Sequence, residues 1–375
     1  MVMDVMAAAA RIEAAGGHVI HMEVGQPAAP APKAAISAAH AALDGGRIDY
    51  TSALGTPSLR ARIARHYRDT YGCAVDAERI VVTTGSSGAF ILGFLAMFEP
   101  GDRVAVTVPG YPPYRHILTA LGCEPVLIET SSETRHALTG EALLAAHHKS
   151  QLRGVLVGSP ANPTGTMMSR EALTSLISAA EGAGIRFISD EIYHGLDYAF
   201  PAVTAAELSP HALVINSFSK YFCMTGWRVG WMVVPEPLVR PVERLQQNLA
   251  ISVPTLSQIA AEAAFEGRDE MEEVKHGYQE NRRILIEGLP QAGLSKFLPA
   301  DGAFYLYVDV GDFTSDSVAF TKEMLNETGV AATPGVDFDA ERGSRYVRFC
   351  YAGTTADMAE AARRLGAWSR LRTRG

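Results

Sequence analysis

The sequence has few cysteines, no long apolar run and no excess of positive charge. Its four cysteines are far apart, with no Cys-x-x-Cys pair and no histidine at zinc-finger spacing, which favours a reducing compartment over a disulfide scaffold. The longest apolar run, near residues 89–98, has the length of an ordinary helix and is too short to span a membrane. The formal net charge of −8 gives no general attraction for nucleic acid or an anionic membrane.

The N-terminus also lacks a basic segment followed by an apolar stretch, so no signal peptide is expected. Together these absences predict a cytoplasmic protein that binds neither nucleic acid nor a membrane. No internal repeat or low-complexity tract is present. With 375 residues, 47% of them apolar and 20% charged, the chain is long enough for two globular domains. We expect a large domain over residues 36–267 and a small domain formed by residues 1–35 and 268–375.

Short apolar segments alternate with stretches of helical length in the first two thirds of the chain. Strands that are apolar throughout and alternate with helices indicate an α/β fold with a mostly parallel sheet covered by helices on both faces. The predicted strands are Arg79–Thr84, Arg103–Val108, Pro125–Ile128, Gly154–Ser159, Ile185–Asp190 and Leu213–Ser217. After about Glu266 the pattern changes to a smaller α+β arrangement, with a long charged helix over Met271–Leu289 and weaker strands at Ala303–Asp309 and Arg345–Cys350.

Polar residues directly follow at least five of the predicted strands. In an open parallel sheet, ligands bind beyond the carboxyl ends of the strands. The polar segments are therefore expected to meet at one edge, as a binding site requires. They are Thr84–Gly88, Pro109–Tyr114, Ser159–Gly165, Asp190–Tyr193 and Ser217–Lys220.

Several of these residues have both a functional and an ordinary interpretation. Gly85, Ser86 and Ser87 open a helix, whose free N–H groups suit a phosphate, although Ser and Gly are also common helix caps. Asp190 ends a buried strand. It either caps a turn or holds the nitrogen of a cofactor ring protonated.

Three basic residues, Lys220, Arg228 and Arg348, have sequence neighbours that suggest a functional role. Lys220 follows two serines after a strand, and Arg228 comes eight residues later. A cation near a desolvated amine lowers the pKa of that amine and makes it a better nucleophile, whereas most lysines are simply solvated. Arg348 lies in a predicted strand between Val347 and Phe349. It is either an outward-facing arginine or a bidentate clamp for a carboxylate.

Taken together, these segments resemble the class I/II aminotransferases, which are pyridoxal-phosphate (PLP) enzymes of fold type I. The most specific stretch is Ser217–Gly230, and Asn162–Gly165 and Asp190–Tyr193 come next. The resemblance extends from Glu23–Pro27 to the strand of Arg348. It implies a PLP-dependent transfer of an amino group between an L-amino acid and a 2-oxo acid by a ping-pong mechanism.

The resemblance also implies roles for the PLP site. Lys220 would hold the cofactor as a Schiff base and act as the proton shuttle, while Asp190 would pair with the pyridinium nitrogen. Asn162 and Tyr193 would hydrogen-bond the phenolic oxygen, and Tyr111 would stack on the ring. The phosphate would be held by residues of three segments, Gly85, Ser86, Ser87, Ser217, Ser219 and Arg228.

Further implied roles concern the substrate and the partner subunit. Arg348 and the backbone of Gly25 would bind the substrate carboxylate, with Asn162 assisting. Tyr50 would reach the phosphate of the neighbouring subunit, so a homodimer with shared active sites is expected. The chain departs from the pattern in its short start before the first helix and in the Ala-Pro-rich segment 28–32, which lacks an acidic residue often found there.

Other functions stay open at this stage. A PLP-dependent carbon–sulfur β-lyase or an aminocyclopropane-carboxylate-synthase-like enzyme would use the same core residues. A non-catalytic amino-acid sensor would need a DNA-binding module, and no basic helix-turn-helix pattern precedes Val19. No G-x-S-x-G motif supports a serine hydrolase, and no metal site is expected at His18 and His21. The amino donor is not identified by the sequence.

Overall fold

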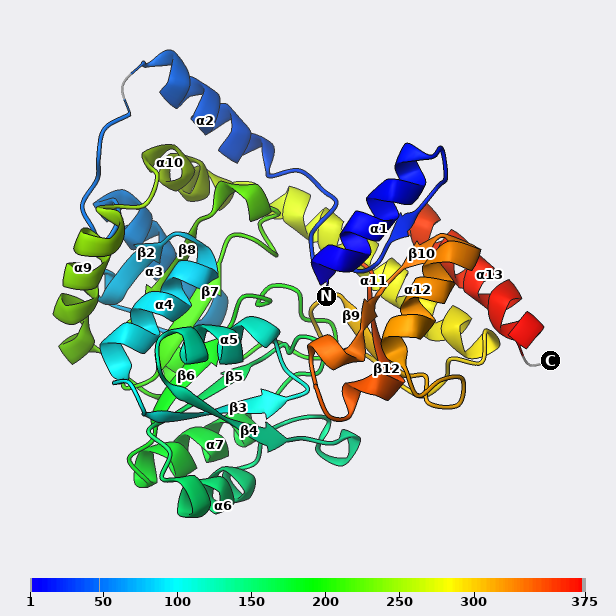
Figure 1. The fold of residues 1–375 in the computed structure, drawn as a ribbon. Coiled ribbons are helices and arrows are strands. Elements are labelled where there is room, and N and C mark those ends of the chain that lie inside the picture. Colours follow the sequence, from blue (N-terminus) through cyan, green and yellow to red (C-terminus); the bar gives the residue numbers. More distant parts are fainter. Residues whose placement is uncertain (1, 47, 373–375) are drawn as a thin grey trace.

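The computed structural model describes residues 2–46 and 48–372. Figure 1 shows two parts, a larger one built on a twisted sheet and a smaller one that carries the C-terminal strands and helices. The long helix α11 (Arg268–Gln291) lies beside the smaller part and leads into it from the larger one.

The larger part contains a seven-stranded sheet in the order β2-β8-β7-β6-β5-β3-β4. Its strands are β2 (Ile80–Thr83), β3 (Arg103–Val108), β4 (Glu124–Glu129), β5 (Gly154–Gly158), β6 (Arg186–Asp190), β7 (Leu213–Ser217) and β8 (Gly230–Val233). Strand β8 pairs antiparallel with both neighbours, and the other pairings are parallel. The six predicted strands are present with ends shifted by at most two residues, but β8 was not predicted.

The alternation of side chains along the strands divides the large core into two layers. On one face, Val155, Phe187 and Val214 pack with α2, α3, α6, α7 and α10. On the opposite face, Leu156 and Ile188 pack with α4, α5 and α9. Both faces of the sheet are therefore covered, which explains why its strands are apolar throughout.

Most helices of these layers begin where the sequence supplies a cap or a proline, and α4 is the exception. For example, the Thr56 side chain accepts from the N–H of Leu59 at the start of α3, and Ser169 caps α7 in the same way. The helices are α2 (Lys33–Asp44), α3 (Pro57–Tyr71), α4 (Gly85–Met97), α5 (Pro112–Ala120), α6 (Gly140–Ser150), α7 (Arg170–Gly182), α8 (Ala205–Leu208), α9 (Glu236–Ala250) and α10 (Thr255–Ala264).

The smaller part has its own apolar core. Its antiparallel sheet has the order β11-β12-β9, and β1 pairs in parallel with β10. The strands are β1 (Ile20–His21), β9 (Tyr305–Asp309), β10 (Val330–Ala331), β11 (Thr333–Pro334) and β12 (Tyr346–Cys350). The helices α1 (Val2–Ala14), α12 (Ser317–Thr328) and α13 (Thr355–Arg372) pack around them with α11. In the described part of the chain, no helix is both long and apolar enough to cross a bilayer.

Candidate active site

The polar segments predicted to meet do follow the carboxyl ends of neighbouring strands. Strand β2 leads into Gly85, β6 ends at Asp190, and β7 leads through Ser217 to Lys220. The smaller part supplies Arg348 from β12 and Gly25 from the segment after β1. The site thus lies between the two parts, at the carboxyl ends of strands in the large sheet.

Lys220 is a half-buried lysine with an unusual environment. Its Nζ donates to the carbonyl of Gly25 at 2.5 Å. The pKa of Lys220 is lowered to about 8, mainly by burial; the charges of Arg348 and Arg228 act in the same direction, and Cys350 and Asp190 act against it. The amine is therefore much easier to deprotonate near neutral pH than an ordinary lysine, as a nucleophile or general base requires.

Asp190 is a buried carboxylate at the end of β6. It accepts a hydrogen bond from the Tyr114 hydroxyl and another from the N–H of Ile192, 3.1 Å away. Burial raises the pKa of Asp190 to about 6, while these hydrogen bonds and the charge of Lys220 lower it. A cationic group placed beside Asp190 would favour its ionised form.

The start of α4 forms a cradle for an anion. Gly85 has a φ of +66°, and a Cβ placed there would lie 2.4 Å from Nη2 of Arg228, so the guanidinium covers the first turn of the helix. The Ser217 hydroxyl donates to Ser219 Oγ at 2.9 Å. A helix N-terminus, two hydroxyls and a guanidinium are a suitable set for a phosphate.

Arg348 is buried, only 4% exposed, and is not the outward-facing arginine that an alternating strand would also allow. Its Nη1 donates to Oδ1 of Asn162 at 2.9 Å, and its Nη2 donates to the carbonyl of Glu23 at 2.6 Å. Its Nε is buried without a partner. Since an unsatisfied buried donor on a cation is costly, this group suits an anionic ligand.

Two tyrosine hydroxyls meet beside this arginine. Tyr193 follows β6, Tyr305 begins β9, and their hydroxyl oxygens lie 2.7 Å apart. The ring of Tyr305 lies under the guanidinium of Arg348, 4.4 Å from its Cζ. A Cβ at Gly25 would be 1.9 Å from the Tyr305 hydroxyl. Only glycine fits at position 25, and the close approach brings its backbone within reach of Lys220.

These residues fit pyridoxal phosphate. The cradle at Gly85 and Arg228 matches a phosphate, Asp190 matches a protonated ring nitrogen, and the Lys220 amine can condense with an aldehyde. The unpartnered Nε of Arg348 leaves a donor for a substrate carboxylate.

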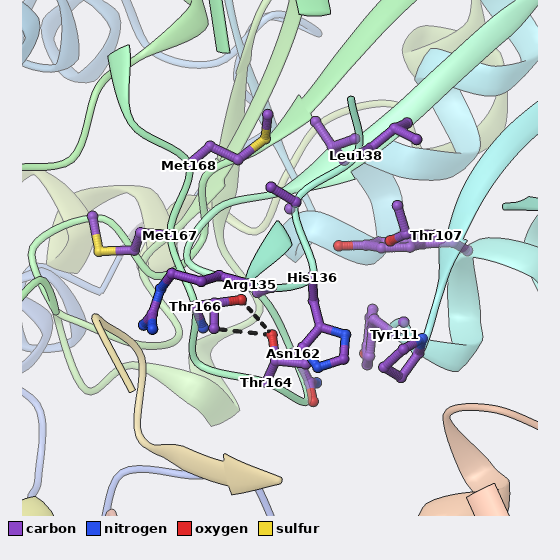
Figure 2. Close-up of a pocket in the computed structure, with 17 residues that line it drawn as sticks. Thr107, Tyr111, Arg135, His136, Leu138, Asn162, Thr164, Thr166, Met167 and Met168 are labelled. Carbon is purple, nitrogen blue, oxygen red and sulfur yellow. Dashed lines mark hydrogen bonds between the residues drawn. The ribbon is translucent and has the colours of Figure 1, made fainter. Parts of the chain in front are cut away.

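Tyr111 lies at the N-terminus of α5 and is half-buried. Its ring packs edge-on against that of Tyr114, with centroids 5.3 Å apart. Figure 2 shows a small cavity that Tyr111, Asn162 and the paired Thr164 and Thr166 line together with Arg135 to Leu138. Its volume of about 20 Å³ holds roughly one water molecule. This cavity is therefore too small to be a substrate site.

Two of the predicted residues have exposed side chains within this chain. Tyr50 is 80% exposed in the connection between α2 and α3. Ser87 is exposed in the first turn of α4, whereas Gly85 is buried and Ser86 half-buried.

His21 hydrogen-bonds Glu23 and Glu13. Among the described residues, no three His, Cys, Asp or Glu side chains are grouped to hold a metal.

The sequence interpretation missed Tyr114, Tyr305 and Thr333. Tyr114 follows Tyr111 by three residues, a helical spacing that places both on one face. Thr333 Oγ1 accepts from Nη2 of Arg348 at 3.3 Å and donates to the carbonyl of Glu23. Tyr305 and Thr333 come from strands whose pairing with β12 was not evident in the sequence, so no local pattern indicated them.

Comparison with known proteins identifies the family. The model of the family "Aminotransferase class I and II" matches residues 17–365. The valine–pyruvate aminotransferase of Mycobacterium tuberculosis is 48% identical over 98% of this chain and 95% of its own length. A crystal structure of an aminotransferase from the same organism superposes with a TM-score of 0.96 at 48% identity, covering 99% of this chain and 96% of that one.

A more distant solved structure has the same fold. The aspartate aminotransferase of Thermus thermophilus, determined with maleate, is 30% identical and has a TM-score of 0.91 over 99% of this chain and 96% of its own. The fold is therefore that of the fold-type-I PLP transferases. The chain belongs to the class I and II aminotransferases, PLP-dependent enzymes that transfer an amino group between an amino acid and a 2-oxo acid.

Proposed function

We propose that Lys220 is the residue to which PLP is attached and the group that moves the substrate proton. Asp190 would hold the ring nitrogen, and Asn162 and Tyr193 the phenolic oxygen. Tyr111 would lie against the ring. The phosphate would be held by the remaining residues of the cradle, Gly85, Ser86, Ser87, Ser217, Ser219 and Arg228. The observation that carries this proposal is the half-buried Lys220, whose Nζ donates to the carbonyl of Gly25 and whose pKa is lowered to about 8, mainly by burial.

Side chains of this protein would bind the substrate and move its proton. PLP, when bound, supplies the electron sink that makes the α-C–H bond of an amino acid acidic. Arg348 would hold the substrate carboxylate through its planar fork, with Asn162 and the backbone of Gly25 fixing its orientation. Nζ of Lys220 would then take the α-proton and return it.

We propose further that the amino donor is a small apolar amino acid and that pyruvate serves as an acceptor. The relative from M. tuberculosis is named as acting on valine and pyruvate. The groups around the carboxylate clamp suit an apolar substituent, because the rings of Tyr305 and Phe338 lie 4.4 and 4.7 Å from Cζ of Arg348.

A donor panel tests this substrate assignment. The purified, PLP-loaded protein is incubated with pyruvate and single amino acids, and alanine and the new 2-oxo acid are quantified by mass spectrometry. We expect valine and its aliphatic neighbours to form alanine faster than aspartate does. A preference for aspartate would overturn the donor class, and release of ammonia and pyruvate from a donor without an acceptor would instead support a β-lyase.

We also propose a cytoplasmic homodimer in which Tyr50 acts across the interface. Tyr50 is exposed, and so are Leu43 and Ile48 earlier in its segment and Leu249 and Ile251 at the end of α9. The two segments meet where the N–H of Thr51 donates to Ser252 Oγ at 3.4 Å. Exposed apolar side chains on adjoining segments are typical of an interface. The segment is held in place, since Thr255 Oγ1 donates to the carbonyl of Asp49 at 2.5 Å. The four cysteines are all buried and free, as expected in a reducing compartment.

Mixing two inactive variants tests the shared site. Tyr50→Ala and Lys220→Ala are co-expressed with different tags, and doubly tagged dimers are isolated. If Tyr50 acts across the interface, one site in each mixed dimer contains both intact residues, and up to half of the wild-type activity per dimer returns. If mixed dimers form and stay inactive, Tyr50 acts within its own chain.

A further inference from the structure

A pair of buried tyrosines connects the two functional halves of the site. Tyr193 belongs to the large part and Tyr305 to the small part, and both side chains are at least 95% buried. Their hydroxyls are 2.7 Å apart, and their rings meet edge-on with centroids 5.6 Å apart. Because burial raises the pKa of both phenols, both stay protonated through the neutral range. Each hydroxyl can therefore donate one hydrogen bond.

Packing restrains the ring of Tyr305 and thereby the position of its hydroxyl oxygen. The ring face is covered by the guanidinium of Arg348, 4.4 Å away. The hydroxyl end lies against Cα of Gly25, where even a methyl group could not be accommodated. Phe304 packs on the ring of Tyr193 from another side, with centroids 5.5 Å apart. The tyrosine pair is thus held by packing against three residues of the smaller part, Gly25, Phe304 and Arg348.

We propose that Tyr305 is a positioning residue that orients the Tyr193 hydroxyl toward the phenolic oxygen of the cofactor. When Tyr305 donates to Tyr193, the proton of Tyr193 is left to point into the site. Hydrogen bonds in such a chain strengthen one another. The inference rests on the proposed role of Tyr193, and it adds a partner from the small part that makes this role depend on the contact between the two parts.

The consequence is a change in the acidity of the bound cofactor. A strong donor at the phenolic oxygen stabilises its anion. Loss of the Tyr305 hydroxyl weakens that donor, so the oxygen becomes more basic and the protonated form of the bound cofactor persists to higher pH. The Tyr305→Phe variant keeps the ring under Arg348, so binding of the substrate carboxylate should change little.

Absorbance titration of the PLP-loaded enzyme measures this acidity without turnover. For Tyr305→Phe we expect the apparent pKa of the bound cofactor to rise by about 0.5 unit, about a threefold change in proton affinity, as partial loss of a cooperative hydrogen bond implies. The KM for the amino donor should stay within about twofold. Tyr198→Phe is the matched control, because the Tyr198 hydroxyl donates to the carbonyl of Ala303 at 2.6 Å, away from Tyr193. It should leave the titration unchanged.

A double-mutant cycle decides whether Tyr305 acts through Tyr193. In a Tyr193→Phe background, Tyr305→Phe should add no further shift. An equal shift in both backgrounds, or no shift in either, would overturn the proposal for Tyr305. If Tyr193→Phe alone leaves the titration unchanged, the assignment of Tyr193 to the phenolic oxygen fails as well, so the two failures are distinguishable.

Discussion

Two carboxylates that are neighbours in sequence, Asp190 and Glu191, lie in opposite environments. Asp190 faces Tyr114 and the charge of Lys220. Glu191 faces away, toward the Ser189 hydroxyl at 3.0 Å and the N–H of Ala205 at 2.7 Å. Burial raises the pKa of Asp190 to about 6 but that of Glu191 to about 8. The charge of Lys220 explains part of this difference between the two pKa values, because it lowers the pKa of Asp190 while burial raises it.

Among the residues that the structure describes, no lysine or arginine forms an ion pair with Glu191. Its Oε2 lies 3.5 Å from Nδ1 of His194, but burial lowers the pKa of His194 to about 4. His194 instead contacts the Tyr71 hydroxyl and the carbonyl of Ser159. Glu191 and His194 are therefore a neutral, structural pair, whereas Asp190 is poised to carry charge. Burial alone does not mark a catalytic carboxylate, and a nearby cation helps to separate the two cases.

Removing the Lys220 side chain should have the largest effect on turnover. Lys220→Ala deletes both the proposed attachment point and the proton shuttle, so we expect turnover to fall by about a thousandfold or more. The variant should still retain PLP through the phosphate cradle, as measured by equilibrium dialysis. Lys275→Ala is the control, since Lys275 pairs with Asp197 at 3.2 Å outside the site. Turnover within tenfold of wild type for Lys220→Ala would contradict the assignment.

Neutralising Asp190 should cost less than removing Lys220. Asn keeps the size of the side chain but loses the charge, and its single oxygen can accept from the Tyr114 hydroxyl or from the N–H of Ile192, where Asp190 accepts from both through separate oxygens. We expect the turnover of Asp190→Asn to fall by about a hundredfold or more, the scale of losing one well-placed electrostatic contact. Stopped-flow measurement of the half-reaction with valine reports it. An unaffected half-reaction would mean that Asp190 is as structural as Glu191.

Changing Arg348, the proposed carboxylate-binding residue, should have a smaller effect, confined to binding of the amino donor. Arg348→Lys keeps the charge and loses the planar fork. The loss of a charge-assisted hydrogen bond predicts about a tenfold rise in the KM of the amino donor, with PLP affinity unchanged. Arg345→Lys provides the matched control, because Arg345 pairs with Asp309 at the exposed edge of the same sheet. Equal KM values for the two variants would show that Arg348 has only a structural role.

The smallest effect on activity is expected at Glu191. Gln retains the hydrogen bonds to Ser189 and Ala205, so Glu191→Gln should keep activity within about threefold. The stability of the variant should nevertheless depend on pH. Below the ordinary pKa of 4.5, Glu191 is protonated in both states. Between 4.5 and about 8, the unfolded chain releases the proton that the folded protein keeps, so wild-type stability falls as pH rises.

The free energy of unfolding of Glu191→Gln should therefore match wild type near pH 5 and exceed it by about 1–3 kcal/mol at pH 8. Urea unfolding at the two pH values measures the difference. An identical difference at both values would show that Glu191 is ionised in the folded protein and that its contrast with Asp190 is not one of charge.

The sequence alone predicted the parts of the fold that local pattern determines. Apolar strands such as Arg103–Val108 and the segment Ser217–Gly230 are recognisable because their residues are contiguous. Strand β8 was missed because it begins at Gly230, the last residue of that motif, which was interpreted as a binding segment. Tyr305 and Tyr114 were missed because each meets its partner, Tyr193 and Asp190, through tertiary contacts 112 and 76 residues apart in the sequence.

The attachment of PLP at Lys220 is the central claim, and covalent trapping tests it most directly. The purified protein is loaded with PLP, reduced with borohydride, digested and analysed by mass spectrometry. We predict the phosphopyridoxyl adduct on the peptide that contains Lys220, with the other five lysines unmodified: Lys33, Lys149, Lys275, Lys296 and Lys322. An adduct on one of those lysines, or no adduct in protein that still binds PLP, would contradict the account.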